Sequence, residues 1–304
     1  MVKHIYISPH SDDVALSCGG QIISNASRQD DTLILNIFTS ESRYSRQGPA
    51  KMESAFRDSI NEDRTKEDKS AWKSIGVRAD FLNLPEAILR KKFPFAILRS
   101  KGDDTIIDDV CGALLPYVKA YPDADFYFPA GIGNHIDHLA CKQAAFRLLD
   151  ECVVDKINLY EDIPYSWLTF IRGQYYKILS RTVALVKSDQ AIASGRGGKN
   201  ILAYLMHGNI PFPRGKKLFT LIYGSLVIDN ALHGSSSSPK PYSGKMRFVD
   251  LGDDNIVKKR DLIYHYKSQI PMLFGKHPDE VLRHNQHSIA REVIVEISRN
   301  RVPD

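Results

Sequence analysis

The chain has 304 residues, of which 43% are hydrophobic and 25% are charged, as expected for a soluble globular protein with a substantial core. Its formal net charge of +5 is mildly basic, and we attribute it to scattered surface lysines and arginines rather than to an anionic partner. No apolar run approaches the roughly 18 residues that a membrane-spanning helix needs, and the first expected strand begins too early for a signal peptide.

The first expected strand ends in a group of polar residues. Residues 4–7 (His-Ile-Tyr-Ile) form a short apolar run closed by a proline, which predicts a buried strand. The apolar spacing of residues 14–23 predicts a helix, which Asp12 or Asp13 can cap. His10 and both carboxylates therefore lie on a tight strand-to-helix turn, where open α/β sheets bind their ligands.

Strands and helices alternate through the first half of the chain. Strands are expected at residues 32–39, 79–84, 124–129 and 157–160, and helices at residues 54–75, 104–120 and 135–152. This alternation predicts an α/β fold, a Rossmann-like, mostly parallel sheet with helices on both faces. Residues 40–51 are polar and contain a Gly-Pro pair, which predicts a loop able to cover a site at the carboxyl edge of the sheet.

A second strand-to-helix turn repeats the first. The strand at residues 124–129 is followed by a glycine turn, and then by His135, Asp137 and His138 at the start of a helix. If the two strands are neighbours, the two turns meet and offer imidazoles and carboxylates, the ligands that Zn²⁺ or Fe²⁺ binds. Spacing alone does not decide whether Asp12 or Asp13 would bind the metal.

The pattern weakens beyond about residue 166. Helices are expected at residues 175–186 and 255–270, strands at 218–223, 225–228 and 289–297, a glycine-rich loop at 194–199 and a serine-rich linker at 234–239. We therefore divide the chain into an α/β core, residues 1–165, and a C-terminal elaboration of the same domain, residues 166–304. The second part is expected to specify the substrate.

The four cysteines predict a cytoplasmic protein. Cys18, Cys111, Cys141 and Cys152 form no C-x-x-C pair and fall mostly in helical patterns, so we expect reduced thiols in the core.

Both turns resemble the signatures of one family. Residues 9–13 (Pro-His-Ser-Asp-Asp) resemble the P-H-P-D-D-E signature of the PIG-L/LmbE-like N-deacetylases, and residues 135–138 (His-Ile-Asp-His) resemble their H-x-D-H signature. The resemblance covers roughly the first 165 residues. It implies a metal-dependent enzyme that removes acetyl groups from N-acetylglucosamine-type amines.

The resemblance also implies a role for each motif residue. The metal, Zn²⁺ with Fe²⁺ as the alternative, would be bound by His10, Asp13 and His138. Asp12 matches the general base, and His135 matches a residue that stabilises the oxyanion or protonates the amine. Asp137 would orient a histidine.

Candidate substrate contacts follow from the same resemblance. Arg64, with Glu67, resembles an arginine-glutamate pattern whose arginine can face the substrate. Glu86 matches an acidic position that can bind sugar hydroxyls. An internal ion pair is the alternative for Arg64 and Glu86. Residues 266–269 (Tyr-Lys-Ser-Gln) resemble a Y-x-S-Q segment of relatives and receive no catalytic role.

Three positions depart from the family pattern. Ser11 stands where proline is usual and Val14 where glutamate is usual, and neither is assigned to the metal or the base. Gly133 stands where some relatives carry a tyrosine that helps to stabilise the oxyanion. That help must come from His135, the metal or another residue.

We therefore predict a zinc-dependent N-deacetylase whose partner is a small-molecule amino-sugar conjugate, and not a nucleic acid. The nearer alternative is an amidase that cleaves another amide in a sugar-thiol conjugate. An Fe(II) oxygenase satisfies the pattern His10-x-Asp12…His138 literally, but such enzymes usually carry it on a double-stranded β-helix. A receiver domain would need an aspartate after the third strand, and a sugar-binding protein with a dead site would not need the full set of polar groups.

Overall fold

The computed structural model describes residues 2–40, 63–92, 94, 104–167, 169–186, 241–275 and 277–300. Most of the expected loop at 40–51, the start of the helix expected from residue 54, and everything expected between residues 187 and 240 lie outside these ranges. The following description concerns the described residues.

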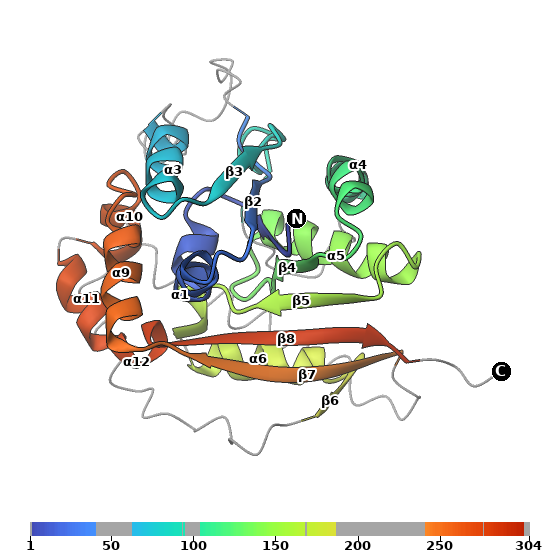
Figure 1. Cartoon of the computed structure of the whole chain (residues 1–304). Helices are drawn as coiled ribbons and strands as arrows, with labels where there is room; N and C mark the ends of the chain where they lie inside the picture. Colours follow the sequence, from blue (N-terminus) through green and yellow to red (C-terminus); the bar gives the residue numbers. More distant parts are fainter. Residues whose placement is uncertain are drawn as a thin grey trace.

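One eight-stranded sheet organises the chain, with the strand order β3-β2-β1-β4-β5-β8-β7-β6 (Figure 1). The first five strands are mutually parallel: β1 His4–Ser8, β2 Thr32–Asn36, β3 Arg78–Phe81, β4 Asp125–Pro129 and β5 Lys156–Tyr160. The C-terminal strands extend the same sheet: β6 Val183–Val186, β7 Tyr242–Asp250 and β8 Arg291–Arg299. Strand β8 pairs antiparallel with β5 and β7, whereas β6 and β7 are parallel. The α/β fold with a mostly parallel sheet is confirmed.

Helices cover both faces of the sheet (Figure 1). One face packs against α4 Asp104–Ala120, α5 Ile136–Asp150 and α6 Thr169–Leu179. The other packs against α1 Asp13–Ser27, α3 Asp63–Ser74 and α9 Asp253–Ile263. The short helices η2 Tyr165–Trp167, α10 Ile270–Phe274, α11 Pro278–His284 and α12 Gln286–Ile289 complete the described fold. Because both faces are covered, the central strands are continuously apolar, as the sequence predicted.

The strand order determines where the polar turns lie. Strand β1 pairs directly with β4, with Tyr6 opposite Tyr127. Both strands run in the same direction, so the turn that follows β1 and the turn that follows β4 reach the same edge of the sheet. The condition set by the sequence, that the two strands be neighbours, is met.

Several predicted boundaries are wrong. The expected helix at 175–186 is instead the end of α6 followed by β6, because Val183–Val186 pairs with β7 and pairing overrides the local pattern. The strand expected at 79–84 ends at Phe81, where Asn83 adopts a positive φ of 62°. The helix expected at 255–270 ends at Ile263. Strand β7 was not predicted, since its glycine and charged residues obscure the alternation.

The cysteine prediction holds in three of four positions. Cys18, Cys111 and Cys141 are buried and free, but Cys152 is exposed and follows the end of α5 with φ 57°. It is therefore not a core thiol, because the turn that connects α5 to β5 points it outward.

Candidate functional site

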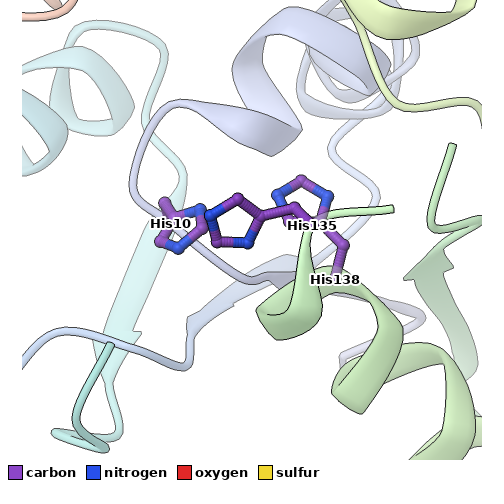
Figure 2. Close-up of side chains that lie close together, drawn as sticks. All are labelled: His10, His135 and His138. Atoms are coloured by element: carbon purple, nitrogen blue, oxygen red, sulfur yellow. The ribbon is translucent and has the colours of Figure 1, made fainter. Parts of the chain in front are cut away.

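Three histidines from the two turns meet at the carboxyl edge of the sheet (Figure 2). His10 follows β1, while His135 and His138 lie at the start of α5. One ring nitrogen of each lies within 4.8 Å of a ring nitrogen of the other two. Residues more than a hundred positions apart thus form one cluster of potential metal ligands.

Asp13 lies between two of these histidines. Its Oδ2 is 3.1 Å from His10 Nδ1 and 3.2 Å from His138 Nε2. The backbone N–H of His10 donates to the same oxygen at 2.8 Å. Asp13 and His138 are buried, so this oxygen and both rings face one another in a region of restricted solvent access.

Each of the two histidines is held from behind by a second carboxylate. His138 Nδ1 lies 2.6 Å from Asp162 Oδ1, and Asp162 also accepts the backbone N–H of Ile132 at 2.8 Å. His10 Nε2 lies 3.1 Å from Asp137 Oδ2. Both carboxylates are almost fully buried, and each leaves one nitrogen of its histidine directed toward Asp13.

Asp137 is itself anchored on the segment that follows β3. Its carboxylate accepts the backbone N–H of Ala87 at 3.0 Å and the Arg90 guanidinium at 2.8 Å. Arg90 also lies over the ring of Phe38, 5.3 Å from its centroid, and donates to the carbonyl of Pro85 at 2.6 Å. The expectation that Asp137 orients a histidine thus has a specific geometry here, directed at His10.

These contacts fit a divalent metal. Metal-ligating histidines usually bond their second nitrogen to a carboxylate or carbonyl, as His10 and His138 do. Two imidazoles and one carboxylate form a donor set that Zn²⁺ accepts, and three ligands leave a position open. His135 differs, because its Nδ1 accepts the backbone N–H of Asp137 at 3.3 Å and so caps α5.

Burial and neighbouring charges both shift the pKa values of the cluster. Burial lowers the pKa of His138, but the charge of Asp13 and hydrogen bonds to Asp13 and Asp162 outweigh it and raise that pKa to about 9. Burial raises the pKa of Asp13, but the charge of His138 and the bonds to both histidines hold it well below its usual value. Burial and the charge of His10 keep the pKa of His135 well below the usual value for histidine. Burial lowers the pKa of His10, but hydrogen bonds to Asp13 and Asp137 outweigh it and raise that pKa well above its usual value. His135 therefore differs electrostatically from the other two histidines.

Asp12 lies beside this cluster with its side chain uncommitted to the helix. It occupies the N-cap position of α1, yet its side chain makes no cap hydrogen bond, so the expected capping by Asp12 is not observed. Its Oδ1 is 4.0 Å from the Arg64 guanidinium, which donates to Glu86 at 2.8 Å. Burial, followed by the charge of Asp13, raises the pKa of Asp12. The structure thus brings Arg64 and Glu86 to the site as an ion pair.

Glu67 and the Tyr-Lys-Ser-Gln segment contact each other away from the histidines. Glu67 accepts the backbone N–H of Ser268 at 2.9 Å and its hydroxyl at 2.7 Å. Tyr266 donates to Asp68 at 2.7 Å. The C-terminal segment is therefore fastened to α3, the helix that carries Arg64.

Two residues of the site were missed from the sequence. Asp162 follows β5 by two positions, and a carboxylate at the carboxyl end of a neighbouring parallel strand was a usable signal. Arg90 carries no such signal, because nothing in the sequence indicates that the segment after β3 returns to α5.

The model of the PIG-L family, described as GlcNAc-PI de-N-acetylase, matches residues 5–149. A 2′-N-acetylparomamine deacetylase of Niallia circulans is 26% identical over 189 residues, which cover 53% of this chain and 66% of that protein. A protein of the same name from Streptomyces fradiae is 30% identical over 175 residues, which cover 54% of this chain and 58% of that protein. Both matches thus span less than two thirds of the relative.

Solved structures share the whole fold. A zinc-inhibited form of the teicoplanin deacetylase Orf2 superposes with a TM-score of 0.63 at 17% identity, covering 99% of this chain and 100% of that one. The A40926 pseudoaglycone deacetylase Dbv21 superposes with a TM-score of 0.61 at 14% identity, covering 99% of each chain. At this identity the likeness concerns the fold. Within the described ranges, no helix has the length and apolarity to cross a membrane.

Proposed function

Because the model of the PIG-L family matches residues 5–149, we propose that the chain belongs to this family and is a metal-dependent N-deacetylase acting on an N-acetylated amino sugar. One observation carries the proposal: Asp13 Oδ2 lies between His10 Nδ1 and His138 Nε2, and each histidine has its own buried carboxylate behind it. The names of the family model and of both curated relatives describe removal of N-acetyl groups from amino sugars, which supports the same reaction.

We assign the metal, proposed as Zn²⁺ with Fe²⁺ as the alternative, to His10, Asp13 and His138. When bound, such an ion lowers the pKa of a water ligand to about 7 and polarises the acetyl carbonyl. His135 is left out of the ligand set because its Nδ1 accepts a backbone N–H.

Asp12 is assigned as the general base. It lies next to Asp13 in the chain, is 6% exposed, and has no capping bond to give up. Burial raises the pKa of Asp12 toward the pH at which the enzyme would work. Such a pKa suits a group that takes a proton from the attacking water and passes it to the leaving amine. The Arg64 guanidinium at 4.0 Å opposes this rise in the pKa of Asp12, because its positive charge favours the ionised carboxylate.

His135 is assigned to the oxygen of the tetrahedral intermediate. With Nδ1 as an acceptor, the proton of the neutral ring resides on Nε2. The lowered pKa of His135 favours this neutral form, whose Nε2–H can donate a hydrogen bond to the developing oxyanion. Asp137 serves by fixing His10 and the start of α5.

Arg64 and Glu86 are proposed to contact sugar hydroxyls, and the part of the chain from residue 166 onward is proposed to select the remainder of the substrate. The described sheet belongs to an α/β fold and not to a double-stranded β-helix, which counts against an Fe(II) oxygenase. The amidase alternative stays open, since it uses the same chemistry on another acyl group.

The unpaired cysteines support our placement of the protein in the cytoplasm.

The test combines elemental analysis with acetate release from N-acetylglucosamine and 2′-N-acetylparomamine. Wild type, Asp12→Asn and the exposed control Asp254→Asn on α9 are compared. We expect metal in all three and at least a hundredfold loss of kcat only in Asp12→Asn. Loss of metal in Asp12→Asn would mean that base and ligand are exchanged. Wild type that binds no metal and releases no acetate would refute the proposal, and release of another acyl group alone would favour the amidase.

A further inference from the structure

The segment that follows β5 is fastened to the histidine site at several points. Asp162 holds His138 and the backbone N–H of Ile132. The backbone N–H of Ile163 donates to Ser17 of α1 at 3.2 Å. Every residue from 161 to 167 is buried except Tyr165, which is partly exposed. The fold therefore fixes this backbone and leaves one aromatic side chain in contact with solvent.

The glycine turn before the histidines is shaped around that side chain. Gly133 has φ +96°, a conformation that favours glycine. A Cβ at this position would lie 2.5 Å from Tyr165 Cγ and 3.0 Å from Tyr165 Cβ, the stiff inner end of the side chain. The ring thus lies directly on the backbone of Gly133, two residues before His135, where any larger residue would displace it.

The same ring lies beside the histidine cluster. Its centroid is 6.4 Å from that of His138, with the two planes nearly perpendicular at 88°. Asp162, three residues before Tyr165, is bonded to His138, so Tyr165 borders the site on a backbone that has little freedom to move.

We propose that Tyr165 is a specificity-determining residue whose ring forms one wall of the substrate site. The inference rests on the proposed deacetylase function. Small-molecule sites are lined mainly by apolar and aromatic side chains, with a few polar groups to orient the ligand. The histidines, Asp12 and the Arg64–Glu86 pair supply polar groups, while Tyr165 supplies an aromatic face. Such a face suits the C–H surface of a sugar ring that carries the acetamide.

The test measures kcat and KM on whichever of the two acetylated sugars wild type deacetylates. Tyr165→Phe keeps the ring, Tyr165→Ala removes it, and Tyr121→Ala removes a partly buried tyrosine at the opposite edge of the sheet. We expect Tyr165→Ala to raise KM about tenfold with kcat changed less than about threefold, and the other two variants to stay within about twofold of wild type. Thermal unfolding and metal content verify that each variant is folded and loaded.

A double-mutant cycle tests the contact with Gly133. Gly133→Ala should raise KM in the wild-type background by displacing the ring. It should raise KM much less in the Tyr165→Ala background, because no ring is left to displace. The backbone strain at Gly133 is common to both backgrounds and cancels in the comparison. A folded, metal-loaded Tyr165→Ala with wild-type KM overturns the inference while leaving the deacetylase intact. An equal effect of Tyr165→Phe and Tyr165→Ala also overturns it, since the hydroxyl would then matter and not the ring. Wild type that binds no metal and releases acetate from neither sugar would instead refute the proposed function.

Discussion

The buried carboxyl group of Asp68 should make the protein less stable as pH rises from about 4 to about 7. Asp68 lies on α3 with 0% exposure and accepts hydrogen bonds from Asn36 at 2.8 Å, Trp72 at 2.9 Å and Tyr266 at 2.7 Å. All three donors are uncharged, and Asp12 adds a like charge nearby. Burial therefore raises the pKa of Asp68 from 3.8 to about 7 despite the three bonds.

The sign and size of this change in stability follow from the linkage between protonation and folding. Between the two pKa values, the folded protein holds a proton on Asp68 that the unfolded chain has released, so folding is favoured by acid. The contribution is fully present below pH 3.8 and is lost as pH rises to about 7. Each pKa unit is worth about 1.4 kcal/mol, which gives an upper limit of about 4 kcal/mol.

Urea unfolding of wild type and Asp68→Asn at several pH values isolates this contribution. The amide has nearly the shape of the protonated acid but does not titrate, and other groups contribute equally to both proteins. The free energy of unfolding of wild type minus that of the variant should fall by about 2–4 kcal/mol between pH 4.5 and pH 8. The substitution Asp254→Asn, at an exposed position, should leave the pH dependence of the free energy of unfolding as in wild type. A difference that is flat with pH, or that rises, would refute the reasoning.

Two further predictions concern other buried carboxylates. Asp162→Asn removes the negative charge that holds His138 Nδ1 at 2.6 Å. Metal affinity, measured against a competing chelator, should fall about 10–100-fold. An unchanged affinity would mean that His138 is positioned without the Asp162 carboxylate. The Lys259 and Glu292 side chains are both 0% exposed and 2.7 Å apart, so Lys259→Met should lower the free energy of unfolding in urea by about 3–5 kcal/mol. An unchanged free energy of unfolding would mean that the backbone N–H groups of Gly20 and Gln21 suffice to hold Glu292.

The sequence was sufficient to identify the two turns whose histidines form the candidate site. Strands with both faces covered are short apolar runs, so β1 and β4 could be recognised, and a histidine follows each within six residues. What the sequence did not contain was the strand order. The two turns meet only because β1 pairs with β4, and that pairing is a tertiary fact.

The residues that support the centre were less predictable for the same reason. Asp162 and Arg90 act on His138 and Asp137 through contacts between separate segments, and no local pattern indicates which histidine a distant carboxylate will meet. The C-terminal strands were obscured differently. Strand β7 carries a glycine and charged residues because it lies between β6 and β8 and is only partly buried, so its alternation is weak.

The segment that follows α9 is joined to α3, the helix that carries Arg64. Tyr266 and Ser268 bond to Asp68 and Glu67, within one turn of Arg64 on α3. None of these contacts involves the histidine cluster. Changes in the C-terminal segment can therefore shift Arg64 while leaving the proposed metal ligands in place. Such a fold can change which substrate it accepts without changing the chemistry, because Arg64 and the proposed metal ligands are supported by different parts of the chain.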